Sequence, residues 1–374
     1  MTSNLWLLIV AALAITFANG ANDNFKGVAT LFGSGTTNYR RALLWATATT
    51  IAGSVMALVL ASSLVVRFGG RGLVPDAVTG DTAFLTAVGG GAAVTVLLAT
   101  LTGFPISTTH ALTGALVGAG FFAANGQLNL SALGTGFVAP LLVSPIAAAL
   151  LMATLYALVG SFRSRFGDTQ DICVCVANTQ PAFESARAAY ASRMTDAQDL
   201  VGSVPIVAAV SECTAHGLRP RGTTSALLDG AHYLSAGAVG FARGVNDTPK
   251  LLALLLPAQM VLPSGIAIPL LAGIMAIGGL LAGGRVAETM SLRVTAMTPG
   301  QGFLANATTA VFVLFASRFG MPVSTTHVST GSLFGLGAVT GGAQWRTIIQ
   351  IVLAWVVTLP CAAACAALLW WLVH

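Results

Sequence analysis

The stretch Gly20-Ala21-Asn22-Asp23-Asn24-Phe25-Lys26 decides the fold, because it returns in the second half of the chain as Gly244-Val245-Asn246-Asp247-Thr248-Pro249-Lys250. A second motif, Pro105-Ile106-Ser107-Thr108-Thr109-His110, follows the first and returns as Pro322-Val323-Ser324-Thr325-Thr326-His327. Two different motifs that recur in the same order and at similar spacing indicate that the chain contains a duplicated unit.

The composition predicts that both copies lie in a membrane. Of the 374 residues, 55% are hydrophobic and 8% are charged, and the mean hydropathy is +0.83. A soluble domain carries about 25% charged residues, so the composition excludes a soluble globule, a disordered chain and a nucleic-acid-binding protein. Five cysteines, an odd number, do not indicate a disulfide framework. The first apolar stretch follows four uncharged residues, so we expect a membrane helix there rather than a signal peptide.

Ten apolar segments, five on each side of a polar interlude, predict an all-α polytopic membrane protein. We expect a first membrane repeat over 1–162, a polar cytoplasmic loop over 163–222 and a second membrane repeat over 223–374. The segments are 5–20 continuing to about 32, 42–66, 82–103, 111–124, 133–162, 226–241 continuing to 256, 266–282, 302–319, 328–339 and 348–373.

The number of segments also predicts how the two copies are oriented. Five spans per copy is an odd number, so the second copy enters the membrane from the opposite side and the repeats are inverted. Arginines flank both ends of the polar interlude, at positions 163, 165, 219 and 221. By the positive-inside rule we expect the central loop in the cytoplasm and both termini outside a cell membrane that the chain crosses several times.

The central loop has a character of its own. Its residues 172–176 and 204–210 alternate or run apolar, which predicts two short strands. Cys173 and Cys175, with Cys213 and His216, could bind a metal ion. Because their spacing is not that of a defined ligand set, we expect free thiols on a small β element, with no metal site.

The two lysines of the chain, Lys26 and Lys250, occupy the same position in the two copies. A lysine at the centre of a membrane helix costs about 2.5–3.5 kcal/mol on insertion scales, so its appearance at both duplicated sites indicates a function. The alternative is that each lysine only snorkels from a helix end or pairs with the aspartate three residues before it, Asp23 or Asp247.

The Asn-Asp motifs predict broken helices at membrane depth. In the first copy, glycine, Asn22 and Asp23 interrupt an apolar stretch; in the second copy, Pro249 follows Asn246 and Asp247. Such breaks, with re-entrant helical turns, are tolerated in a membrane only where they line a cavity or are buried in protein. Unwound carbonyls together with Asn and Asp oxygens suit a small hard cation, so Asp23 and Asp247 are expected to take part in cation or proton coupling.

The Ser-Thr-Thr motifs predict an oxyanion site. The proline ends one helix, and the hydroxyl residues cap the next helix, whose free N–H groups and positive dipole end attract an anion. The expected substrate-binding residues are Ser107, Thr108, Thr109, Ser324, Thr325 and Thr326. His110 and His327 suit a carbonyl-bonded position near the cap better than a proton relay.

The duplicated pair of motifs resembles the PiT family of inorganic phosphate transporters, over both membrane halves but not over 163–222. The resemblance implies an inverted-repeat carrier, a homodimer in the lipid bilayer, that moves inorganic phosphate together with Na⁺ or H⁺. It implies that the Asn-Asp and Ser-Thr-Thr motifs build the phosphate and cation sites. The resemblance therefore adds Asn22 and Asn246 to the expected substrate-binding residues, and the duplication of the two lysines adds Lys26 and Lys250.

This chain departs from the family pattern at its lysines. The common family motif has asparagine where Lys26 stands, and often where Lys250 stands. An asparagine can bind Na⁺, whereas an ammonium group repels it, so the sequence favours H⁺ over Na⁺ as the coupling ion.

The expected function is secondary active uptake of inorganic phosphate by cation symport, with no organic cofactor and no nucleic-acid partner. The alternative is that the chain is a sulfate permease of the same fold. A channel lined by Asp and Lys is a further alternative. An intramembrane hydrolase with Ser107 as nucleophile and His110 as base is another, but an enzyme needs one site and here every element is doubled.

Overall fold

The structure is a computed structural model that describes residues 2–166, 172–176, 205–209 and 219–374. The helices of the first half are α1 (Thr2–Asp23), α2 (Ala29–Gly33), α3 (Tyr39–Ala61), α4 (Ser63–Phe68), α5 (Thr82–Thr102), α6 (Thr108–Ala123), α7 (Leu130–Leu133), the π-helical turn η1 (Gly134–Val138) and α8 (Ala139–Phe166). Those of the second half are α11 (Thr224–Leu254), the 3₁₀ turn η2 (Leu256–Ala258), α12 (Ser264–Ala282), α13 (Gly284–Leu292), α14 (Pro299–Arg318), α15 (Thr325–Thr340) and α16 (Trp345–Val373).

Each of the ten predicted apolar segments is helical, which confirms the predicted all-α class of the membrane part. Local chemistry sets several of the helix ends. The side chains of Asn38 and Asp81 accept from backbone N–H groups in the first turns of α3 and α5. Thr298 and Gln301 form a capping box at the start of α14.

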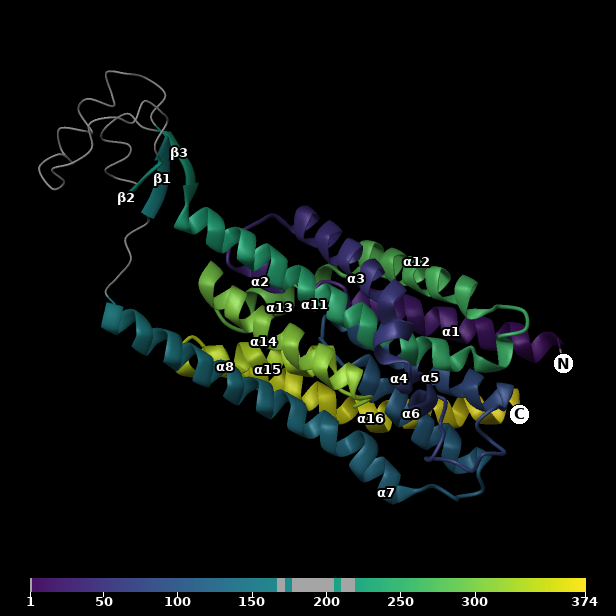
Figure 1. Cartoon of the computed structure of the whole chain (residues 1–374). Coiled ribbons are helices and arrows are strands. Elements are labelled where there is room, and N and C mark those ends of the chain that lie inside the picture. Colours follow the sequence, from purple (N-terminus) through teal and green to yellow (C-terminus); the bar gives the residue numbers. More distant parts are fainter. Residues whose placement is uncertain (1, 167–171, 177–204, 210–218) are drawn as a thin grey trace, which may run out of the picture. The chain divides into compact units, whose positions relative to one another are not determined.

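Seven helices of the described residues are long and apolar enough to cross a membrane: α1, α3, α5, the α7–α8 segment, α12, α14 and α16. Helix α11 carries more charge, and α6 and α15 are short. Within the bundle, α1 packs between α5 and α12, and α16 packs against α5 and α6. The N-terminus, where α1 begins, and the C-terminus, where α16 ends, lie at the same end of the bundle (Figure 1).

Glycines bring α3 and α11 into very close contact. A Cβ atom on Gly244 of α11 would lie 2.2 Å from the carbonyl oxygen of Thr50 in α3, and one on Gly53 of α3 would lie 2.0 Å from the carbonyl oxygen of Phe241. Small residues allow membrane helices to approach in this way. This approach places the second Asn-Asp motif directly against α3.

The two Asn-Asp motifs differ in backbone structure. Helix α1 ends at Asp23 and α2 begins at Ala29, so the first copy is broken as predicted, at the end of its motif. The break predicted at Pro249 is wrong, because α11 continues through it to Leu254. Proline removes one intrahelical hydrogen bond, and the residues around it, including Thr248 and Leu251, are buried among neighbouring helices that hold the backbone in place.

A small sheet lies in a second compact unit, Leu158–Ala231, separate from the unit formed by Met1–Ala157 and His232–His374. Strand β1 (Ile172–Val176) pairs antiparallel with β2 (Pro205–Ala209) and with β3 (Arg219–Thr223), in the order β2-β1-β3. The first two strands confirm the sequence prediction, while β3 was not predicted. Cys173 and Cys175 lie in β1; the other two residues of the possible metal site, Cys213 and His216, lie outside the described residues.

Candidate functional site

The two Ser-Thr-Thr motifs begin helices with nearly identical geometry. Ser107 precedes α6 with φ −99° and ψ 118°, and Ser324 precedes α15 with φ −102° and ψ 120°. The Oγ atom of Ser107 accepts from the N–H of His110 at 3.0 Å, and that of Ser324 accepts from the N–H of His327 at 3.2 Å. The predicted helix caps are confirmed. Each serine satisfies the third amide of its helix and leaves the two preceding amides without a partner inside the helix.

Lys26 is buried and surrounded by oxygen atoms of both copies. Its Nζ atom forms an ion pair with Oδ1 of Asp23 and donates to Oδ1 of Asn22 at 2.8 Å. It also donates to the carbonyl oxygen of Ile106 at 2.7 Å and to Oγ1 of Thr326, in the opposite copy, at 2.7 Å. The amino group therefore connects its own Asn-Asp motif to both Ser-Thr-Thr motifs.

Lys250 repeats this arrangement with the copies exchanged. Its Nζ atom lies 3.1 Å from Oδ1 of Asp247, in its own copy, and donates to Oγ1 of Thr109, in the other copy, at 2.7 Å. It also donates to the carbonyl oxygen of Val323 at 3.1 Å. Each lysine thus connects its own aspartate to the second threonine of the opposite motif. The ion pair with the aspartate is present, but it is one of several contacts of each lysine. We call the two lysine–threonine bonds, Lys26 to Thr326 and Lys250 to Thr109, the crossed lysine contacts.

The two motif asparagines hold the loops that precede α6 and α15. Oδ1 of Asn22 accepts from the N–H of Ile106 at 3.1 Å, and its Nδ2 donates to Oγ1 of Thr100 at 2.9 Å. In the second copy, Oδ1 of Asn246 accepts from the hydroxyl of Ser317 at 3.0 Å, and its Nδ2 lies 3.3 Å from the carbonyl oxygen of Val323. These amides fix the position of each Ser-Thr-Thr motif relative to the Asn-Asp motif.

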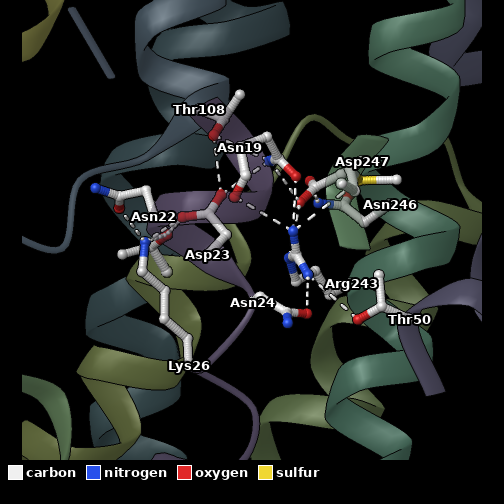
Figure 2. A network of polar contacts seen from close by, with 12 residues as sticks. Asn19, Asn22, Asp23, Asn24, Lys26, Thr50, Thr108, Arg243, Asn246 and Asp247 are labelled. Carbon is white, nitrogen blue, oxygen red and sulfur yellow. Dashed lines mark hydrogen bonds and ion pairs between the residues drawn. The ribbon is translucent and has the colours of Figure 1, made fainter. Parts of the chain in front are cut away.

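The carboxylates of the two motif aspartates both accept from the side-chain amide of Asn19 (Figure 2). Its Nδ2 atom lies 3.0 Å from Oδ2 of Asp23 and 3.1 Å from Oδ2 of Asp247, and 3.0 Å from Oγ1 of Thr108. Thr108 in turn donates to Oδ2 of Asp23 at 2.9 Å. The side chain of Asn19 therefore joins the carboxylates of the two copies.

Arg243 reaches the same centre from α11 (Figure 2). Neither Arg243 nor Asn19 was identified as a site residue from the sequence. Its Nη2 donates to Oδ1 of Asn19 at 2.7 Å, and its Nη1 donates to Oδ1 of Asn24 at 3.0 Å and to Oγ1 of Thr50 at 3.2 Å. A signal for both residues was present: each lies four residues before the motif aspartate, and an arginine inside an apolar stretch is unusual.

The motif histidines lie against each other. The ring centroids of His110 and His327 are 4.4 Å apart, and those of His327 and Trp355 are 3.9 Å apart, with the two rings tilted by 37°. Nδ1 of His327 lies 3.3 Å from the carbonyl oxygen of Leu141, as expected for a carbonyl-bonded histidine. Nδ1 of His110 is buried and has no hydrogen-bond partner among the described residues.

The structure thus joins nine of the twelve predicted site residues in one buried network: Asn22, Asp23, Lys26, Thr108, Thr109, Asn246, Asp247, Lys250 and Thr326. Ser107 and Ser324 are buried as helix caps, and Thr325 is buried at the first position of α15. Within the described parts of the chain, no group of three or more His, Cys, Asp or Glu residues could hold a metal ion.

The chain is similar in sequence to proteins described as transporters. A sequence model of the phosphate transporter family matches residues 19–366. The chain is 28% identical to a protein of Mycobacterium leprae and 30% identical to one of Mycobacterium bovis, both described as "probable low-affinity inorganic phosphate transporter". The matches cover 100% and 99% of this chain, and 80% and 78% of those proteins.

One solved structure shares the fold. It is described as "The sodium-dependent phosphate transporter", is 22% identical in sequence, and matches with a TM-score of 0.75 over 100% of this chain and 99% of that chain. At this level of identity the match establishes the common fold.

Proposed function

The chain belongs to the phosphate transporter family, and from this premise we propose that it is a secondary active carrier that takes up inorganic phosphate together with a cation. The resemblance noted in the sequence is thereby confirmed, and the chain is an integral membrane protein. The observation that carries the proposal is the pair of crossed lysine contacts, Lys26 to Thr326 and Lys250 to Thr109.

These contacts place the groups that attract an oxyanion at one centre. Two ammonium groups meet two threonine hydroxyls at the beginnings of α6 and α15, where the first two amides have no partner inside their helices. A tetrahedral oxyanion offers acceptor oxygens to all of these donors. When it binds, it replaces the threonine oxygens as acceptors for the lysines, so binding changes the bonds that connect the two copies.

A bond that connects the copies and competes with the substrate suits alternating access. A carrier needs two arrangements of its halves around one site, and a substrate shifts the balance only through contacts that differ between them. The crossed lysine contacts supply such a difference. A channel would not need it, and a hydrolase would have no use for two equivalent sets of donors.

The coupling ion in this proposal is a proton rather than Na⁺. Each motif aspartate is already neutralised by a lysine, and an ammonium group repels a metal cation. Inorganic phosphate can arrive with a proton attached, whereas sulfate does so less readily. The substrate of this carrier is therefore phosphate, and sulfate is the competing alternative.

The proposed topology has inverted repeats, a cytoplasmic central loop and both termini outside the cell membrane. It is supported by the two termini, which lie at one end of the bundle (Figure 1), and by the arginines that flank the loop. The carrier works as a homodimer in the bilayer, as the resemblance implies.

Uptake into proteoliposomes tests the proposal. Radiolabelled phosphate or sulfate is supplied with a Na⁺ gradient or a pH gradient imposed separately. We expect saturable phosphate uptake that an inward proton gradient stimulates and that unlabelled phosphate inside accelerates by exchange. Preferential uptake of sulfate would favour the sulfate permease instead. A conductance without saturation or exchange would favour the channel.

A further inference from the structure

The charges at the centre of the bundle do not balance. Among the described residues, the buried side chains that carry a formal charge are Asp23, Asp247, Lys26, Lys250 and Arg243. Two carboxylates and three basic groups sum to one positive charge. Histidines are counted as neutral in this sum.

The surplus charge belongs to Arg243, because each aspartate already has a lysine as its partner. Asp23 pairs with Lys26 and Asp247 pairs with Lys250. The contact of Arg243 with a carboxylate is longer: its Nε atom lies 3.7 Å from Oδ2 of Asp247 and forms no hydrogen bond there. The two lysines therefore neutralise the aspartates, and the guanidinium remains as the excess cation within the described residues.

Most atoms around the guanidinium are oxygens of the types that bind a hard cation, and the exception is Sδ of Met275, 4.0 Å from Nη2. The terminal nitrogens of the guanidinium donate to the side-chain oxygens of Asn19, Asn24 and Thr50 and to the backbone carbonyl oxygen of Asn19, which lies 3.3 Å away. With the Asp247 carboxylate nearby, the set comprises amide, hydroxyl, carbonyl and carboxylate oxygens. Oxygens of these types, around the end of a broken membrane helix such as α1, also bind Na⁺.

We propose that Arg243 is a built-in cation that takes the place of a bound coupling Na⁺ in this carrier. This inference rests on the proposed function for its consequence in transport. With Arg243 in place, one singly charged oxyanion makes the centre neutral without any bound metal ion. Without it, the loaded centre carries one negative charge, and the oxygen set around the vacated position attracts Na⁺.

The test replaces Arg243 with asparagine, the residue at the equivalent position of the first copy, Asn19. We expect wild-type phosphate uptake to be equal in choline and in Na⁺ at fixed pH. In choline, phosphate uptake by R243N should be at least about tenfold lower than that of the wild type. The loaded centre of the variant carries an uncompensated buried charge, which costs more than the 1.4 kcal/mol that a factor of ten represents. Na⁺ restores a large part of this uptake, and phosphate then drives uptake of radioactive Na⁺ by the variant alone.

Further variants separate the effect of the charge from an effect on the structure. R243K keeps the positive charge and should transport in choline without stimulation by Na⁺. R293Q removes an exposed arginine paired with Glu288, and should behave as the wild type. If R243N does not fold, R243Q supplies the same change of charge with a larger side chain.

Binding of Na⁺ gives a readout that does not depend on transport. Na⁺ should raise the thermal unfolding temperature of detergent-solubilised R243N in a saturable way and leave that of the wild type unchanged. The proposal is overturned if wild-type uptake requires Na⁺, if R243N transports fully in choline, or if R243N gains no Na⁺ binding. A wild type that takes up no phosphate under any gradient would refute the proposed function instead, and the Na⁺-binding measurement would still decide the role of Arg243.

Discussion

Arg243 donates from Nη2 to Oδ1 of Asn19 at 2.7 Å, although the two residues occupy equivalent positions in the two copies, each four residues before the motif aspartate. The duplication has therefore diverged at the point where its copies meet. The first copy supplies a neutral amide that joins both aspartates, and the second supplies a guanidinium that this amide accepts from. The chemistry of the centre depends on this difference as much as on the repeated motifs.

The crossed lysine contacts predict that the second threonine of each motif is needed for transport. Thr326→Val and Thr109→Val remove the hydroxyls that accept from Lys26 and Lys250 in the empty carrier and that can donate to the oxyanion in the loaded carrier. A buried bond to a charged group is worth about 1.5–3 kcal/mol. We expect phosphate uptake to fall at least about tenfold in both variants. Thr113→Val is the matched control, because its hydroxyl donates within α6 to the carbonyl oxygen of Thr109, at 2.8 Å. Uptake unchanged in either motif variant would contradict the proposed role.

The buried Lys26–Asp23 ion pair predicts a stability effect that a double variant reverses. Lys26→Met leaves a buried carboxylate without its partner, which costs about 3–5 kcal/mol. Lys26→Met combined with Asp23→Asn should recover most of this loss, measured by thermal unfolding in detergent. The exposed pair Arg293–Glu288 is the control, and its removal should cost at most about 1 kcal/mol. Equal destabilisation by the single and the double variant would show that the pair is not the source of the effect.

The close contact of α3 with α11 predicts that Gly244 tolerates no side chain. In Gly244→Ala the new methyl group would lie 2.2 Å from the carbonyl oxygen of Thr50, so the helices must separate, at a cost of about 1–3 kcal/mol. The separation also disturbs the contact of Arg243 with Thr50. Gly230→Ala, on the same helix with open space around the new Cβ, should be neutral or slightly stabilising. A wild-type unfolding temperature for Gly244→Ala would show that the helices are less tightly packed.

The proposed topology predicts which cysteines an external reagent can reach. In a variant with the remaining three cysteines replaced, Cys173 and Cys175 of the central loop should not react with an impermeant thiol reagent added to intact cells. They should react after the membrane is permeabilised. A cysteine introduced at Ser3, near the N-terminus, should react from outside and serves as the positive control. Rapid labelling of the loop cysteines in intact cells would reverse the orientation.

The helices and the duplication could be predicted from the sequence because both depend on short stretches of neighbouring residues. Apolar segments of membrane length define the helices, and proline followed by serine and two threonines defines the starts of α6 and α15. The importance of Lys26 and Lys250 was also visible, because lysine occurs at no other position. Each of these signals lies within a short stretch of chain, so the cost of placing its residues in a membrane can be judged from that stretch alone.

Only the tertiary structure decided which residues meet. The sequence gives no indication that Lys26 contacts Thr326 rather than Thr109, or that Asn19 joins both aspartates, because these contacts depend on how the two copies pack. It also could not decide whether Pro249 breaks its helix, since neighbouring helices hold the backbone of α11 there. The excess charge of Arg243 emerges only when each aspartate is seen to have a lysine partner already, and pairing at a buried centre is a property of packing, not of spacing along the chain.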